Sequence, residues 1–235
     1  MRRVFFLIVA AVLTANLCVQ KTYGQFKVSV GARAGANFTK FGGSDAKEFA
    51  ELFDEIGLDM KDALKPGFQL GVVASAHLVR DRLMIQPGII FAQQGARWTA
   101  SESDDGVKYK LDVAMPLNYI QIPINVICQI DLASNMALML QAGPYTGYGI
   151  NGKIKAKLSA TDGKTSVNRS EEEDLVFGID EDLSFIDFGV GIGAGLLIME
   201  KIHFSVGYNL GLANIASDVK MQNRGVAVTL AFMFN

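Results

Sequence analysis

The stretch that decides the fold is residues 186–197, which read IDFGVGIGAGLL. Every second residue from Ile186 to Leu196 is apolar, and the residues between them are Asp187 and four glycines. A period of two predicts a β-strand, because successive side chains leave opposite faces of a strand. Glycine usually marks a close backbone approach within a strand, so the glycine face indicates a narrow, crowded interior. We therefore expect a small closed barrel whose apolar side chains point outward, into lipid.

Seven further segments show the same alternation of apolar and polar or small residues. They are residues 27–38, 67–79, 83–98, 117–128, 136–148, 202–212 and 226–234. With residues 186–197 they make eight strands, each near or above the roughly 10 residues that cross a bilayer at a tilt. The sequence thus predicts an all-β fold, an eight-stranded antiparallel up-and-down transmembrane barrel, and eight strands suffice for a bacterial membrane barrel.

The connections between these segments alternate in length. The long ones are residues 39–65, 99–116, 151–185 and 213–223, and the short ones are residues 80–82, 129–135 and 199–201. This alternation predicts long extracellular loops at one end and short periplasmic turns at the other, where both termini lie. The long loops are acidic, as in residues 171–174. Apolar residues spaced i, i+3, i+4, i+7 predict a short helix over residues 45–56 in loop one, with Ser44 as a possible N-cap.

The N-terminus has the pattern of a secretory signal. Arg2 and Arg3 precede a short apolar run, and small residues near Gly24 indicate cleavage there. We expect residues 1–24 to be a cleaved signal peptide and residues 25–235 to form one outer-membrane barrel domain. The mature chain then keeps a single cysteine, Cys128, so no intramolecular disulfide is possible.

Composition narrows the range of functions. The formal net charge of −2 gives no indication of nucleic-acid binding. Half of the residues are hydrophobic, yet no apolar stretch after the signal is long enough for a spanning helix. A closed barrel satisfies its backbone hydrogen bonds in lipid without helices. No cofactor site and no Cys/His metal cluster is expected.

Alternation alone does not decide which face of the barrel meets lipid. A soluble, lipocalin-like periplasmic barrel that carries an apolar ligand also alternates, with its apolar side chains inside. The inner stretches of the strands hold few charges, mainly Arg33 and Asp187. This scarcity favours the membrane barrel, because a charge on a lipid-facing wall is costly.

Polar side chains are expected to fill the barrel as a structural plug. The candidates are Arg33, Gln69, His77, Gln86, Gln121, Gln141, Asp187 and His203. Arg33 and Asp187 are the one opposite-charge pair among them, and we expect them to satisfy each other because a buried unpaired charge is costly. Pro87, Pro123 and Pro144 fall inside strands, where each is expected to sit at a bulge.

A lipid-modifying barrel enzyme is the remaining alternative. His77 and His203, with Ser75, Ser205 and Asp187, supply the residue types of an acyl-transfer triad. Their expected orientation is into the lumen, and no Gly-x-Ser-x-Gly motif accompanies them. We therefore predict a protein that is not an enzyme.

Several short motifs recur on the predicted strands: NYIQIPI at 118–124, QP at 86–87, GPY at 143–145, DFG at 187–189 and YNLGL at 208–212. Together they resemble one family, the PorT-like outer-membrane β-barrel proteins common in Bacteroidetes. Gln121 stands where the family pattern has an acid, and Asn235 follows the terminal aromatic residue. The resemblance implies an outer-membrane protein that is inserted by the barrel assembly machinery and is in contact with outer-membrane lipid. The acidic loops are expected to meet an extracellular or envelope partner.

Overall fold

The computed structural model describes residues 28–46, 48, 60–79, 82–104, 107–162, 166–178, 183–216 and 219–234. Its strands are β1 (Val28–Gly42), β2 (Lys61–Ala63), β3 (Lys65–Val79), β4 (Leu83–Asp104), β5 (Val107–Ala133), β6 (Met136–Thr161), β7 (Ser166–Leu175), β8 (Ile186–Ile198), β9 (Ile202–Gly211) and β10 (Gln222–Phe234). The predicted signal peptide lies outside the described residues. No helix among the described residues is long and apolar enough to cross a membrane.

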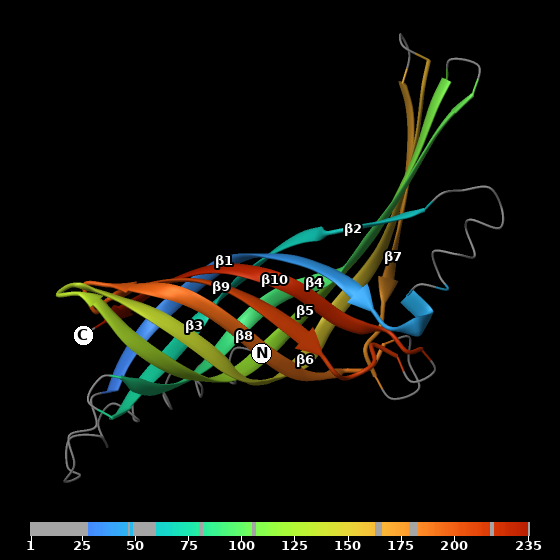
Figure 1. Cartoon of the computed structure of the whole chain (residues 1–235). Helices are drawn as coiled ribbons and strands as arrows, with labels where there is room; N and C mark the ends of the chain where they lie inside the picture. The colour runs from blue at the N-terminus through green and yellow to red at the C-terminus, as the bar shows by residue number, and fades with distance from the viewer. Residues whose placement is uncertain are drawn as a thin grey trace.

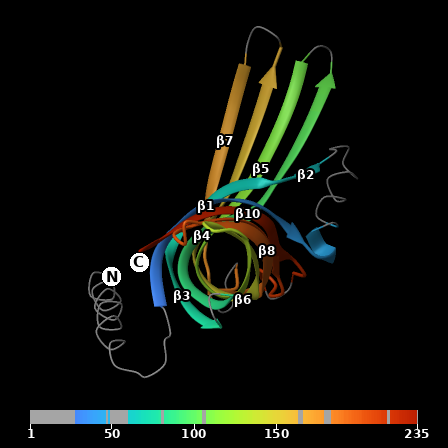
Figure 2. The same cartoon turned by 60° about the vertical axis from the view of Figure 1, so that its left-hand side comes forward.

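Eight of these strands close into a ring in the order β1-β3-β4-β5-β6-β8-β9-β10. Neighbours are antiparallel, and β1 closes the ring against β10 from Val30–Phe234 to Gly42–Gln222. Figure 2 shows the closed cylinder nearly end-on, and Figure 1 shows the strands running obliquely along it. The predicted eight-stranded antiparallel barrel is confirmed.

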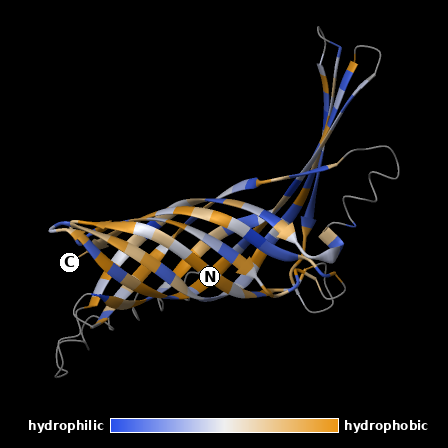
Figure 3. Cartoon of the chain, viewed as in Figure 1, coloured by the Kyte–Doolittle hydropathy of each residue, from blue (hydrophilic) through white to orange (hydrophobic). Residues whose placement is uncertain are grey.

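The apolar side chains point away from the barrel axis. Ile192 is 63% exposed, Leu230 53% and Val206 43%. Figure 3 shows hydrophobic and hydrophilic residues alternating along each strand of the barrel wall. A lipocalin-like barrel with its apolar side chains inside is therefore wrong for this chain.

The glycine face of β8 lies against the neighbouring backbone, as the sequence predicts. A Cβ added to Gly195 would lie 2.7 Å from the Ser205 Cβ and closer still to the Phe204 carbonyl oxygen. A Cβ on Gly193 would lie 2.9 Å from the Gly207 Cα. Only glycine allows this approach, because any larger residue would push β8 and β9 apart.

Three strands of the barrel, β4, β5 and β6, continue beyond it where the sequence predicts loops, and β7 pairs with the extension of β6. β4 and β5 extend as a hairpin through residues 97–104 and 107–114, and β6 and β7 extend through residues 152–161 and 166–175. With β2 they form a sheet in the order β2-β4-β5-β6-β7, here named the projecting sheet. The expectation of loops at 99–116 and through most of 151–185 is wrong. Residues 107–114 and 153–158 alternate charged with mostly apolar residues, but the polar residues of 101–104 and 166–174 lack the apolar period by which the strands of the wall are recognised.

A β-bulge separates the barrel part of β6 from its extension. Asn118 pairs with Asn151 but Tyr119 pairs with Gly149, so Ile150 is an extra residue on β6. One extra residue moves the following side chains to the other face of a strand. Odd-numbered residues of β6 therefore face the lumen before the bulge and the outside after it.

The strand prolines are not at bulges, contrary to expectation. The β4–β5 register passes from Pro87–Ile124 to Ile90–Gln121 with equal numbers of residues skipped on both strands. The β5–β6 register does the same between Pro123–Tyr145 and Val126–Ala142, and Pro144 pairs with Val190 in regular register. Each proline removes one ladder donor, and the remaining pairs on both sides hold the strand in register.

The predicted helix of loop one falls mostly outside the described residues. Residues 44–46 and 48 are helical. Ser44 lies within this turn and its hydroxyl is 2.6 Å from the Asp45 carboxylate.

Candidate functional site

The barrel lumen holds the polar side chains that the sequence analysis singled out. Arg33, Gln86, Gln121, Asp187 and His203 are buried. Gln69, His77 and Gln141 are half-buried and line internal cavities. The lumen therefore gathers all eight of these residues.

Short hydrogen bonds connect several of these groups to polar neighbours. Gln86 Nε2 donates to Ser75 Oγ at 2.9 Å, and Gln69 Nε2 donates to Asn37 Oδ1 at 2.8 Å. Arg33 Nη2 donates to Thr229 Oγ1 at 3.3 Å. Each of these hydrogen bonds satisfies a polar group that would cost free energy if it were buried without a partner.

The expected pairing of Arg33 with Asp187 is wrong. Asp187 Oδ2 instead accepts a hydrogen bond from Asn223 Nδ2 at 3.3 Å, and the same amide lies 3.3 Å from the Tyr119 hydroxyl. Arg33 is beside Gly71 in the middle of β1, whereas Asp187 is at the beginning of β8, three strands further round the ring. Alternation predicts that both side chains point inward, but it does not give their heights or their places around the ring. Tyr119 and Asn223 are the partners that sequence reasoning missed.

Side chains leave only small spaces in the lumen. A cavity of about 50 Å³ near the middle is lined by Arg33, Gln121 and Gln141. Another of about 100 Å³, near the termini, is lined by His77 and His203. An eight-stranded barrel is only wide enough for its own side chains, so these spaces suit a few waters rather than a channel.

An apolar cluster covers the lumen at the end opposite the termini. Phe41 and Trp98 pack with ring centroids 5.9 Å apart, and Tyr119 meets Phe177 edge-on at 5.6 Å. Leu183 and Ile215 come from the connections after β7 and β9 and complete the cover. Solvent therefore does not reach Asp187, which lies beneath this cluster and is 3% exposed.

The candidate triad residues are not arranged as a triad. Ser75 Oγ is bonded to Gln86, and Ser205 Oγ lies 2.7 Å from Thr229 Oγ1. Asp187 is bonded to Asn223 rather than to a histidine. Within the described residues, no group of three or more His, Cys, Asp and Glu side chains is placed to hold a metal ion.

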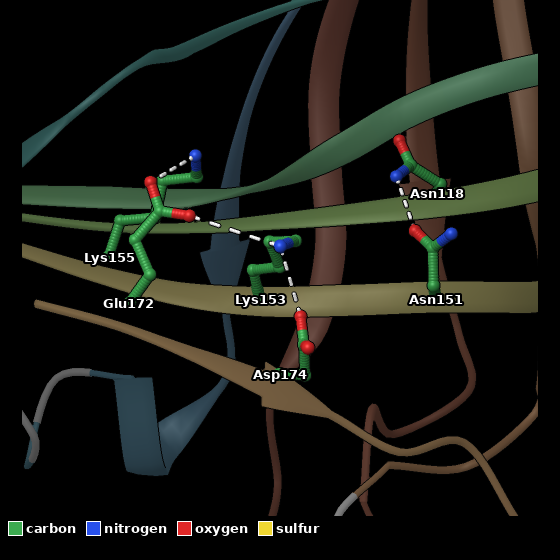
Figure 4. Close-up of polar contacts among 6 residues, drawn as sticks. All are labelled: Asn118, Asn151, Lys153, Lys155, Glu172 and Asp174. Atoms are coloured by element: carbon green, nitrogen blue, oxygen red, sulfur yellow. Dashed lines mark hydrogen bonds and ion pairs between the residues drawn. The ribbon is translucent and has the colours of Figure 1, made fainter.

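The projecting sheet carries a second polar arrangement, on its surface. Arg97 Nε donates to Asp112 Oδ1 at 2.8 Å, and Arg97 Nη2 donates to the other carboxylate oxygen. Lys155 Nζ lies 2.7 Å from Glu172 Oε1, and Figure 4 marks this ion pair with a dashed line. The hydrogen bond from Arg97 holds the pKa of Asp112 below its ordinary value, and the hydrogen bond from Lys155 does the same to the pKa of Glu172.

The acidic run at residues 171–174 lies on a strand, not in a loop. Glu172 and Asp174 pair with lysines of β6, and Lys153 lies 3.1 Å from Asp174. Glu171 and Glu173 point to the opposite face, because neighbouring residues of a strand alternate. The run therefore divides its charge between the two faces of β7.

A closed antiparallel barrel with an apolar outer wall and a polar, filled lumen defines an integral outer-membrane β-barrel protein. The sequence matches the family described as outer membrane protein beta-barrel domain over residues 20–217, and the chain belongs to that family. It is an integral protein of the outer membrane.

Solved structures with a similar barrel include Neisserial surface protein A. That structure is 13% identical, with a TM-score of 0.37, over 88% of this chain and 99% of that one. Ail of Yersinia pestis is 10% identical, with a TM-score of 0.35, over 88% and 99% of the two chains. The N-terminal barrel domain of Pseudomonas aeruginosa OprF is 12% identical, with a TM-score of 0.30, over 89% and 100%. A search of curated proteins gives no match.

Proposed function

We propose that this chain is a non-enzymatic outer-membrane barrel of PorT-like type whose projecting sheet meets an extracellular or envelope partner. The observation that carries the proposal is the projecting sheet itself. Ladder pairing continues from the barrel wall to Asp104–Val107 on one hairpin and Thr161–Ser166 on the other. A platform this regular, at the end away from the termini, is suited to holding a binding surface outside the membrane.

The absence of catalysis is supported by the state of the lumen. Ser75, Ser205 and Asp187 are bonded to groups other than histidine, and the apolar cluster covers Asp187. A catalytic group must be within hydrogen-bond reach of its substrate, and a lipid outside the wall is not. The PorT-like type is supported by the motifs on neighbouring strands, such as residues 118–124 on β5 and 143–145 on β6.

The acidic face of the projecting sheet is the surface that we assign to the partner. This face of the projecting sheet is the one on which Trp98 lies, nearer the barrel. Three glutamates share it, namely Glu102 on β4 and Glu171 and Glu173 on β7. All three glutamates are exposed. Charge complementarity steers encounters and fixes the orientation of partners, so we expect the partner to present a basic surface.

Photo-crosslinking in intact cells tests this assignment. A crosslinking residue in place of Glu173 is expected to give a specific product, and the second substitution Glu171→Lys is expected to reduce its yield. A crosslinking residue in place of Ile192 serves as the matched control, because that position faces lipid. The same products from both positions, or a yield that is unchanged by Glu171→Lys, would contradict the proposed partner surface.

A further inference from the structure

One face of the projecting sheet continues the lipid-facing wall of the barrel. On β5, Ile122, Ile124 and Val126 are exposed on the barrel wall. Asn118, Lys110 and Lys108 are also even-numbered residues of this strand, so their side chains lie on the same face. No residue is inserted or removed along this part of β5 relative to β4. The face therefore changes from apolar to basic where the barrel ends.

The bulge on β6 brings three more lysines onto this face. Tyr148 faces lipid before the bulge, and Lys153, Lys155 and Lys157 share its side of the sheet after it. Figure 4 shows Asn118, Asn151, Lys153 and Lys155 on one side of their strands. Without the extra residue Ile150, the same lysines would point to the opposite face.

The charges of the projecting sheet are thus sorted between its two faces. The cations of this face, which we name the basic outer face, are Lys61, Arg97, Lys108, Lys110, Lys153, Lys155 and Lys157, and its carboxylates are Asp112, Glu172 and Asp174. The opposite face carries Asp62, Glu102, Asp104, Glu171 and Glu173, with Arg169 as its cation among the described strand residues. The outer face keeps a net positive charge. None of the ion pairs between described residues involves Lys108, Lys110 or Lys157.

A row of amides marks the boundary between the apolar wall and the basic outer face. Gln93 Nε2 donates to Asn118 Oδ1 at 3.2 Å, and Asn118 Nδ2 donates to Asn151 Oδ1 at 2.6 Å. The row crosses β4, β5 and β6 at one level. Amides satisfied in this way fit the interface between hydrocarbon and headgroups, where the wall no longer has to be apolar.

A hollow lies directly above this row. Its volume is about 340 Å³, and its lining includes Lys65, Arg97, Lys155 and Lys157, with Asp112 as the one carboxylate. Pro116 and Gln93 line its lower part, next to the row of amides. A hollow of this size fits a phosphorylated headgroup, and its cations are suited to a phosphate group.

The projecting sheet leans away from the barrel axis, as Figure 1 shows. When strands of a barrel wall bend outward, the face that continues the outer wall turns toward the membrane. We propose that the basic outer face binds the phosphate groups of lipids in the outer leaflet and holds the projecting sheet against the membrane surface. The acidic face then points away from the membrane. The position of the hollow favours lipid over a soluble anion, because the hollow begins where the lipid-facing wall ends.

Hydrogen exchange of the full-length protein in lipid vesicles tests this inference. The protein is reconstituted in phosphatidylcholine alone, or in phosphatidylcholine mixed with phosphatidylglycerol. We expect phosphatidylglycerol to slow exchange of the amides at 107–114 and 152–161 by at least about five-fold, roughly the effect of one lysine at an anionic surface. This protection is expected to weaken as salt is raised.

Two matched variants separate the basic outer face from general charge. The Lys110→Gln/Lys157→Gln variant removes two cations of that face and is expected to lose the protection. The Arg169→Gln/Lys201→Gln variant removes the same charge from the opposite face and from the β8–β9 turn, and is expected to keep it. Heat-modifiable migration on a gel shows that each variant has a folded barrel.

Equal exchange in the two kinds of vesicle would overturn the inference, as would equal loss of protection in the two variants. Protection by inorganic phosphate in phosphatidylcholine vesicles would assign the hollow to a soluble anion. Protection by dextran sulfate there would assign the face to a polysaccharide. Either result would also refute the lipid contact, and neither bears on the crosslink from position 173.

Discussion

Ile192→Arg is the substitution that most directly tests how this barrel meets its surroundings. Ile192 is at the middle of β8, and its register partners Ala142 and Tyr208 are also exposed. An arginine on the lipid face costs about 2–4 kcal/mol at the bilayer midplane and about 0–1 kcal/mol near the interfaces. At 1.4 kcal/mol for each factor of ten, the midplane cost lowers the folding equilibrium constant roughly 30- to 700-fold.

Met199→Arg is the matched control for this substitution. Met199 is 64% exposed and Ile192 63%, but Met199 lies in the turn after β8, at the membrane edge. The two arginines therefore differ in depth and hardly at all in exposure. The assay is reversible urea unfolding of the protein in phosphatidylcholine vesicles. An unfolding free energy within about 0.5 kcal/mol of the unsubstituted protein for Ile192→Arg, or equal losses for both variants, would refute the outward orientation of the wall.

Three further predictions concern packing, pH and accessibility. Gly195→Val is expected to destabilise the barrel by about 1–3 kcal/mol, because the valine side chain would overlap β9. Gly147→Ala is the control: its Cβ would lie no nearer than 3.5 Å to other atoms, so the unfolding free energy should change by less than about 0.5 kcal/mol. The lowered pKa of Asp112 means that its bond to Arg97 stabilises the sheet above the ordinary carboxyl pKa. The protection factors of the amides at 107–114, which correct for the intrinsic exchange rate at each pH, should therefore fall as pH drops below about 4, and should not do so in Asp112→Asn. Cys128, exposed on the wall, should react with a lipophilic maleimide in vesicles and resist a charged one; equal reactivity would contradict its place in lipid.

The barrel wall is the part of the fold that the sequence predicts well. Residues 186–197 alternate without interruption because one face meets hydrocarbon and the other meets a crowded lumen. Both constraints act on every residue of such a strand, so the period is strong. The same pattern correctly predicts that Arg33 and Asp187 point inward.

The projecting sheet escaped prediction because neither of its faces meets hydrocarbon. Residues 107–114 alternate lysines and Asp112 with apolar residues or Tyr109, but the acidic and polar residues of 166–174 give no such signal. The bulge at Ile150 changes which residues of β6 face outward, from even-numbered ones before it to odd-numbered ones after it. Strict alternation from Tyr148 would therefore place Lys153 on the wrong face. Register between distant strands also has no local signal, which is why the partners of Arg33 and Asp187 could not be named.

The pairing of β1 with β10 sets an order of events during biogenesis. Val30 pairs with Phe234, so β1, the earliest described strand, cannot complete the ring until β10 is present. Until then, two rows of unpaired amides and carbonyls remain open to any other chain in the periplasm. A chain truncated before residue 222 lacks β10 and cannot close its barrel. We expect such a fragment to be held by a chaperone or degraded.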